Sequence, residues 1–357
     1  VLAALVSLPA AGPWKQAAAG YTYAFPRDHA SHPDFKIEWW YYTGNVDAAD
    51  GRRFGYQVTF FRIGVDRTPT NPSKWAVRDL FVTHLAVSDI SGGRYLFDER
   101  LSRGGPGLAG AETDRYRVWN DDWTAGLDDR GRHVIEAHGA RIGLTLTLDE
   151  GKRPTINGVG GISQKGAQAG NASHYYSLTR MPTRGTVSIN GMTVPVTGTS
   201  WMDHEFGTSF LEAGQQGWDW LSMQLDDGRE LMLYQLRKAD GSRDPHSSGT
   251  LVGRDGQTRH LSADDFSLTP AGRTFTSRSG AIYPVAWRIA IPSAGVTLDV
   301  TTPLVDQELT TDTSSAITYW EGAIDVAGRA KGASVRGRGY LEMTGYRGSL
   351  GRVLSSS

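Results

Sequence analysis

An internal repeat constrains the fold of this chain more than any other feature of its sequence. Residues 39–62 contain an aromatic run, an Asp-Gly turn signal and a second apolar run, and residues 218–237 repeat this order. The spacing is kept, because Trp218 follows Trp39 by 179 residues and Tyr234 follows Tyr56 by 178. Two apolar runs joined by Asp-Gly are typical of a β-hairpin. The repeat therefore predicts two related units, each containing such a hairpin.

A second repeated motif lies later in each unit and consists of an aromatic residue followed two positions later by a carboxylate. The pair Trp201-x-Asp203 is matched by Tyr340-x-Glu342, 139 residues further on. Closed barrels suit units built from short hairpin-connected strands, because closure removes exposed strand edges. We therefore expect an all-β protein with two consecutive β-barrels related by internal duplication. The expected leader, N-terminal domain, C-terminal domain and tail are residues 1–19, 20–212, 213–352 and 353–357.

The composition agrees with an all-β chain. The sequence holds 44 glycines, 11 tryptophans and 14 tyrosines, and its aromatic residues fall in short runs with threonine and valine. Helical periodicity never persists over three turns, so helices should be few and short. Strands are expected at residues 38–46, 54–62, 79–87, 115–119, 134–137, 144–148, 174–179, 186–189 and 193–198.

Charge and leader patterns narrow the partners and the compartment. A net charge of -1 without a basic block gives no reason to expect nucleic acid as a partner. The absence of cysteine excludes disulfides and thiolate chemistry. The first eleven residues are apolar and end in small residues, as secretory signals do, so we expect an exported protein, periplasmic or secreted. No later stretch reaches the roughly 18 apolar residues of a membrane helix, so no integral membrane segment is expected.

The stretch at residues 198–207 contains the candidate site. Read as a strand, it places Trp201, Asp203 and Glu205 on one face. Burying two carboxylates beside a large aromatic residue costs free energy of folding, unless this face of the strand lines a pocket. Asp203 and Glu205 also fit the paired carboxylates of a glycosidase. A metal site is not expected, because no HxH or HExxH spacing occurs.

The aromatic-rich motifs, taken in order, resemble the AttH/CrtC family. That family includes carotenoid 1,2-hydratases, also called hydroxyneurosporene synthases, and proteins described as secreted hydrolases or AttH-like transport components. The resemblance covers residues 35–347 and implies lipocalin-like barrels, a lipophilic isoprenoid or carotenoid-like ligand and no cofactor. It also allows a membrane-associated or ABC-transport partner. The motifs are Glu38-Trp39-Trp40-Tyr41-Tyr42-Thr43-Gly44, Tyr175-Tyr176-Ser177, Trp201-Met202-Asp203-His204-Glu205-Phe206-Gly207, Trp218-Asp219-Trp220, Asp306-Gln307-Glu308-Leu309, Tyr319-Trp320-Glu321-Gly322 and Thr344-Gly345-Tyr346.

The resemblance also implies roles for individual residues. In the hydratases an aspartate acts as the acid two residues after an aromatic, and a histidine stands two residues before another aromatic. These patterns match Trp201-x-Asp203 and His174-x-Tyr176. The order of the aromatics, tyrosine then tryptophan, is the reverse of the one expected, which leaves the substrate open. Pairing of the two strands would place the four side chains together.

The chemistry of such a site is acid-initiated hydration. Asp203 could stay protonated near neutral pH if burial and the charge of Glu205 raise its pKa. The rings of Trp201 and Tyr176 could stabilise a carbocation, and His174 could position water. Alternatively, Asp203 and His174 hydrogen-bond each other and simply hold two strands together.

Three functions remain open at this level. The first is a hydro-lyase that adds water to a C=C bond of a lipophilic substrate. The second is a non-catalytic carrier or export accessory for such a molecule, and the third is a carbohydrate-active protein using Asp203 and Glu205. A purely structural pair should recur in both units, yet Thr318 stands in the second unit where the first has His174. This difference favours one specialised site in the first unit.

Overall fold

The computed structural model describes residues 13–67, 69–209, 211–315 and 317–348. Residues 1–12 of the expected leader and the expected tail at 353–357 lie outside the described residues. The described chain is all-β, and its helical elements are three single 3-10 turns, η1 (Arg27–His29), η2 (Ala263–Asp265) and η3 (Pro292–Ala294). Among the described residues, no helix is long and apolar enough to cross a membrane.

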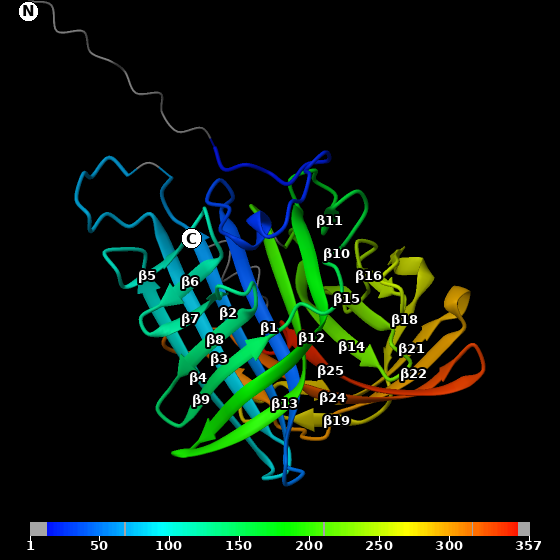
Figure 1. Ribbon diagram of the computed structural model, residues 1–357. Coiled ribbons are helices and arrows are strands. Elements are labelled where there is room, and N and C mark those ends of the chain that lie inside the picture. Colours follow the sequence, from blue (N-terminus) through cyan, green and yellow to red (C-terminus); the bar gives the residue numbers. More distant parts are fainter. Residues whose placement is uncertain (1–12, 68, 210, 316, 349–357) are drawn as a thin grey trace, which may run out of the picture.

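Two large antiparallel sheets form the fold (Figure 1). The first runs in the order β4-β3-β2-β1-β13-β12-β9-β8-β7-β6-β5, with β10 and β11 paired to β12. Its strands are β1 (Ile37–Ala48), β2 (Arg53–Gly64), β3 (Asp79–Asp89), β4 (Arg94–Arg103), β5 (Ala109–Ala111), β6 (Arg117–Asn120), β7 (Trp123–Leu127), β8 (His133–His138), β9 (Ile142–Leu148), β10 (Thr155–Ile156), β11 (Ile162–Gln164), β12 (Ala172–Ile189) and β13 (Met192–Gly207).

The second sheet runs in the order β17-β16-β15-β14-β25-β24-β22-β21-β18, with β23 paired to β24, and β19 and β20 form a separate hairpin. These strands are β14 (Gln215–Leu225), β15 (Glu230–Lys238), β16 (Ser248–Val252), β17 (Thr258–Leu261), β18 (Ser267–Pro270), β19 (Thr274–Thr276), β20 (Ile282–Pro284), β21 (Ala286–Ile291), β22 (Val296–Thr301), β23 (Glu308–Thr310), β24 (Thr318–Ala330) and β25 (Ala333–Thr344).

The strand order confirms the internal duplication. The neighbours β2-β1-β13-β12 of the first sheet recur as β15-β14-β25-β24 in the second. The first sheet curls into a nearly closed barrel and the second into a more open half barrel, a lipocalin-like arrangement. The two hairpins identified in the sequence are β1–β2 and β14–β15, and each turns through an Asp-Gly pair whose glycine has positive φ. The predicted fold class is therefore confirmed.

Alternation along β1 gives that strand two different faces. Trp40 and Tyr42 are fully buried in the core of the first barrel. Trp39 and Tyr41 point the other way and join a cluster of aromatic residues shared with the second unit. Because side chains alternate across a strand, the aromatic run serves both the barrel core and the junction between units.

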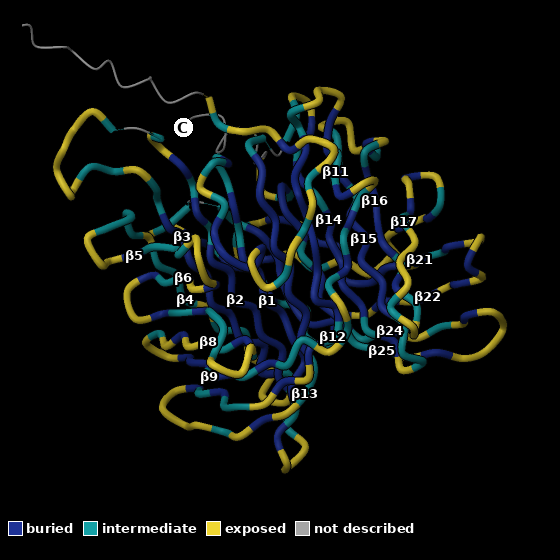
Figure 2. The backbone as a smooth tube through the Cα atoms, turned by 45° about the horizontal axis from the view of Figure 1, so that its top comes forward, coloured by how far each residue is buried: buried dark blue, intermediate teal, exposed yellow. Residues whose placement is uncertain are grey.

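The two units are packed together along these outer faces. The chain is most deeply buried along the central strands, whereas its exposed parts gather at the turns (Figure 2). Gly55 shows how close the approach is, since a Cβ there would lie 2.7 Å from the Cβ of Ala323 on β24. Arg180 reaches across to Glu230, whose side chain is fully buried, with 2.5 Å between Nε and Oε1. The junction is thus an extended packed interface.

The expected strands at 174–179 and 186–189 are parts of one long strand, β12, which contains a β-bulge. The register shifts between Leu178 and Met181, so that two residues of β12, Thr179 and Arg180, lie opposite the single residue Trp201 of β13. A bulge of this kind reverses the faces of every side chain beyond it. This reversal decides which residues reach the candidate site.

Candidate active site

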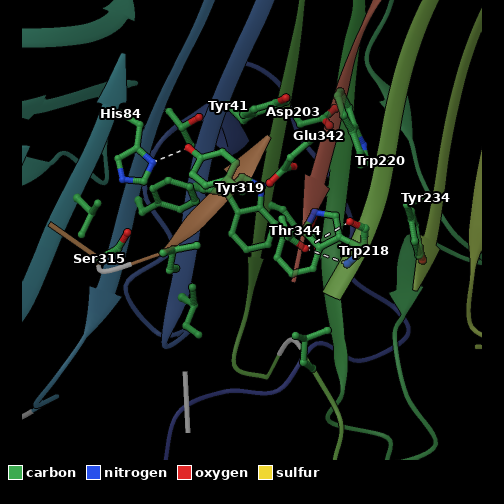
Figure 3. Close-up of a pocket in the computed structure, with 18 of the residues that line it drawn as sticks. Tyr41, His84, Asp203, Trp218, Trp220, Tyr234, Ser315, Tyr319, Glu342 and Thr344 are labelled. Carbon is green, nitrogen blue, oxygen red and sulfur yellow. Dashed lines mark hydrogen bonds between the residues drawn. The ribbon is translucent and has the colours of Figure 1, made fainter. Parts of the chain in front are cut away.

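A cavity of about 220 Å³ lies where the two units meet (Figure 3). Its wall is largely aromatic and aliphatic, and its polar groups are a few carboxyls and hydroxyls, two lysines and one histidine. The first unit contributes from β1, β2, β3, β12 and β13, and the second from β14, β15, β24 and β25. The principal lining residues are Trp39, Tyr41, Phe61, His84, Lys165, Tyr175, Asp203, Glu205, Trp218, Trp220, Tyr234, Tyr319, Glu321 and Glu342.

The internal repeat explains how this wall is composed. Trp39 of β1 and Trp218 of β14 occupy equivalent positions in the two hairpins, and both line the cavity. Asp203 of β13 and Glu342 of β25, the matched carboxylates of the sequence repeat, line it as well. Each unit thus presents the same face to its partner. The duplication places two carboxyl groups in one largely apolar space.

Asp203 is buried and held by three donors. The Tyr175 hydroxyl donates to Oδ2 at 2.6 Å, while the Ser177 hydroxyl and the Trp201 indole N–H donate to Oδ1 at 2.5 and 2.6 Å. Burial raises the pKa of Asp203 to about 6, against the lowering effect of these three hydrogen bonds and of Lys165. Asp203 therefore exchanges its proton just below neutral pH.

Lys165 is a functional candidate that no sequence pattern indicated. It lies in a loop rich in glycine, glutamine and asparagine, yet its side chain is buried and its Nζ donates to the Ser173 hydroxyl at 2.9 Å and pairs with the carboxylate of Glu205. The ammonium lies 5.6 Å from the ring centre of Tyr175, within cation–π range. Burial lowers the pKa of Lys165 to about 7, although Asp203 opposes this effect. A loop lysine reaches the cavity only through tertiary packing.

The second unit adds two carboxyl groups with raised pKa values. Burial, together with the charge of Asp203, raises the pKa of Glu342 to about 7, against the lowering effect of its hydrogen bond with Trp218. Burial and the charge of Glu342 raise the pKa of Glu321 well above its ordinary range. His84 stays neutral, because burial lowers its pKa to about 4, and its Nδ1 lies 2.7 Å from the Tyr319 hydroxyl (Figure 3).

His174 and Tyr176 do not lie beside Asp203, and this corrects the expected arrangement. The register pairs Tyr175 with Glu205 and Ser177 with Asp203, so these four share a face. The reason is the bulge in β12. Next to the turn between β12 and β13, Ile189 pairs with Met192. If this register continued without the bulge, residue 176 would lie opposite residue 205.

The displaced pair faces the interior of the first barrel. Tyr176 is fully buried there, and its hydroxyl lies 2.7 Å from Nδ1 of His29. His174 packs on the ring of Tyr21, with centroids 4.5 Å apart. Of the five residues predicted for the site, Trp201, Asp203 and Glu205 share the face that borders the cavity, and His174 and Tyr176 lie behind the sheet.

The comparison with known proteins agrees with this architecture. A family model described as AttH-like matches residues 16–346. The chain belongs to the AttH-like family. The AttH-like chain is similar to the crystal structure of a protein from Nitrosomonas europaea assigned to AttH, with 35% identity, coverage of 93% of this chain and 99% of that chain, and a TM-score of 0.84.

Two less similar proteins are named as a hydratase and a dehydratase. Kievitone hydratase from Nectria haematococca shares the fold, with 16% identity, coverage of 93% of the AttH-like chain and 98% of the other, and a TM-score of 0.71. The dehydratase asqC of Emericella nidulans is 23% identical over 234 residues, which is 63% of each protein. The AttH-like chain thus aligns with under two thirds of that curated relative's length.

A further buried carboxylate of the AttH-like protein lies outside the cavity lining. Asp219 stands between two tryptophans in β14 and is fully buried. Its Oδ2 lies 3.0 Å from Nε of Arg237, and its Oδ1 accepts from the Tyr346 hydroxyl at 2.9 Å. Burial raises the pKa of Asp219 to about 6, against the opposing charge of Arg237.

Proposed function

We propose that this AttH-like protein catalyses the acid-initiated addition of water to a C=C bond, or the reverse elimination, in an apolar isoprenoid-like substrate held between the two units. The observation that carries the proposal is Asp203, a carboxyl with a pKa of about 6 in a cavity walled mainly by aromatic and aliphatic side chains. The names of kievitone hydratase and the dehydratase asqC support the same reaction class.

Asp203 and Glu342 provide an acid and a base. The protonated carboxyl of Asp203 gives its proton to one alkene carbon, which leaves a cation on the neighbouring carbon. A water oxygen bonds to that cation, and the proton released goes to the carboxylate of Glu342. Proton exchange between the two carboxyls restores the starting state, so that the net change is the addition of one water molecule.

The pKa values set how much of the protein is reactive. Asp203 has the lower value, about 6, and Glu342 the higher, about 7. Among singly protonated pairs, the reactive form with the proton on Asp203 is therefore the minority, because the group with the higher pKa holds the proton more tightly. The two groups titrate as a coupled pair, and the rate should peak between pH 6 and 7. The rings of Trp220 and Tyr175 near the cavity supply faces that stabilise a cation.

The size of the cavity narrows the substrate. At about 220 Å³ it is smaller than the roughly 300–1,000 Å³ typical of pockets that enclose a drug-sized ligand. It fits one branched alkene terminus of an isoprenoid, with the remainder of the molecule outside. We propose that a carotenoid-like or other isoprenoid substrate enters the cavity only with a prenyl-type terminus.

The test is incubation with acyclic isoprenoid alkenes in heavy-oxygen water, followed by mass spectrometry of the extract. Wild type should incorporate the label, while Asp203→Asn and Glu342→Gln should bind the alkene without converting it. Asp219→Asn is a matched control, because it neutralises a buried carboxyl of similar pKa that does not line the cavity. Labelled product from Asp203→Asn would refute the mechanism. Bound but unchanged alkene in every variant, wild type included, would instead identify a carrier.

A further inference from the structure

A cluster of two histidines and one glutamate lies at one end of the first barrel, outside the lining of the cavity. His29 belongs to η1, His133 is the first residue of β8, and Glu150 follows the end of β9. One ligand atom from each residue lies within 4.8 Å of the others. The Oε1 of Glu150 is 3.2 Å from Nε2 of His29 and 3.8 Å from Nε2 of His133. Three segments distant in sequence thus converge on one point.

The Nε2 atom of His133 has no hydrogen-bond partner among the described residues, although its side chain is fully buried. The separation of 3.8 Å from Glu150 is too long for a hydrogen bond. Buried polar atoms in folded proteins nearly always have a partner, and one without calls for an explanation. This atom is turned toward Glu150 and His29, which indicates that a ligand completes the cluster.

The rings of both histidines are oriented from behind by tyrosines. Nδ1 of His29 lies 2.7 Å from the hydroxyl of Tyr176, and Nδ1 of His133 lies 2.8 Å from the hydroxyl of Tyr42. A metal at Nε2 requires the imidazole proton on Nδ1, where each tyrosine oxygen can accept it. The Tyr176 hydroxyl in turn donates to the carbonyl oxygen of Asp28 at 3.1 Å. Such partners typically fix the tautomer and direction of metal-binding histidines.

A neighbouring cluster of His32, Glu38 and His204 shows the contrast. Its glutamate is already saturated, with Nδ1 of His32 and Nε2 of His204 each at 2.9 Å. The guanidinium of Arg62 also donates to Glu38 at 3.0 Å, so that a positive charge is already present there. A metal ion at that point would be repelled. The cluster of His29, His133 and Glu150 has no such arginine among its ion pairs in the described chain.

We propose that His29, His133 and Glu150 form a binding site for a divalent first-row transition metal, with zinc as the best match. Two imidazoles and a carboxylate suit zinc, whose bonds of about 2.0–2.2 Å place tetrahedral ligands roughly 3.3 Å apart. The observed separations require only small shifts. Three protein ligands leave a fourth position for water. The side chain of Glu150 is 37% exposed, which gives the ion a route from solvent. The bound ion ties the segment before β1 to the β8–β9 end of the barrel.

The test is calorimetric titration of the full chain with zinc after treatment with a chelator, together with cobalt absorption as a report of coordination. One equivalent of zinc should bind to wild type and none to Glu150→Gln, whose partly exposed position tolerates the change. Tyr42→Phe should weaken zinc binding about 10- to 100-fold, because it removes the hydroxyl that orients the ring of His133 through Nδ1. The matched controls are Asp149→Asn, whose carboxylate is 44% exposed, and His138→Gln, which alters an exposed histidine; both should leave binding intact.

Three results would overturn the proposal. The first is the absence of stoichiometric zinc uptake by the folded wild-type chain. The second is zinc uptake that persists in Glu150→Gln, which would show that Glu150 is not a ligand. Loss of uptake in His138→Gln would equally overturn the proposal, because it would assign the metal to a surface histidine. Because the cluster does not line the inter-unit cavity, the proposal stands or falls independently of the hydratase assay.

Discussion

Replacing Asp203 with asparagine should stabilise the protein at pH 8 while it removes catalysis. Burial raises the pKa of this carboxyl from 3.8 to about 6. Because the folded-state pKa is the higher one, ionisation opposes folding: stability falls as the pH rises from about 4 to about 6, and the loss is complete above that. A shift of about two units at about 1.36 kcal/mol per unit amounts to about 3 kcal/mol. Asparagine cannot ionise and escapes this loss.

The measurement is urea unfolding of wild type and Asp203→Asn at pH 4 and pH 8, followed by tryptophan fluorescence. At pH 4 the free energies of unfolding should agree within about 1 kcal/mol, because a neutral amide replaces a neutral acid. At pH 8 the variant should be more stable by about 3 kcal/mol. Asp149→Asn, a control at a half-buried surface ion pair, should differ from wild type by less than about 1 kcal/mol at either pH. A variant less stable than wild type at pH 8 would show that the Asp203 carboxylate holds the fold together, and would refute the argument.

Other substitutions test the remaining parts of the site. At pH 6, where Lys165 with its pKa of about 7 is still charged, Lys165→Met leaves the buried carboxylate of Glu205 without its cation, so it should cost about 3–5 kcal/mol of unfolding free energy, measured by urea titration; an unchanged midpoint at that pH would contradict the pairing. Gly55→Val should cost about 1–3 kcal/mol, because its Cβ would lie 2.7 Å from that of Ala323; a neutral effect would mean that the units separate easily. His174→Gln should keep wild-type turnover in the heavy-oxygen assay, since His174 lies behind the sheet, and loss of turnover with the fold intact would restore it to the site.

Much of the fold could be predicted from local patterns. Side-chain alternation is a property of a few consecutive residues, so the strand character of β1 and the shared face of Asp203 and Glu205 follow from sequence alone. The repeat of Trp39 at Trp218 likewise predicted two related units with matching hairpins. The match between Asp203 and Glu342 was also visible, although not that both would line one cavity.

The tertiary structure decided which side chains meet. A spacing of two residues shows that His174 and Tyr176 lie on the same face of their strand. It does not show which face this is, because the choice of face depends on the register with β13. Because the bulge beside Trp201 adds one residue to β12, Tyr175 and Ser177 lie opposite Glu205 and Asp203. His174 and Tyr176 consequently point to the other side of the sheet. The approach of Lys165 and the meeting of the two walls are contacts between residues far apart in the chain. Local periodicity thus determined the strands and their faces, whereas register and packing, which depend on distant residues, decided the site.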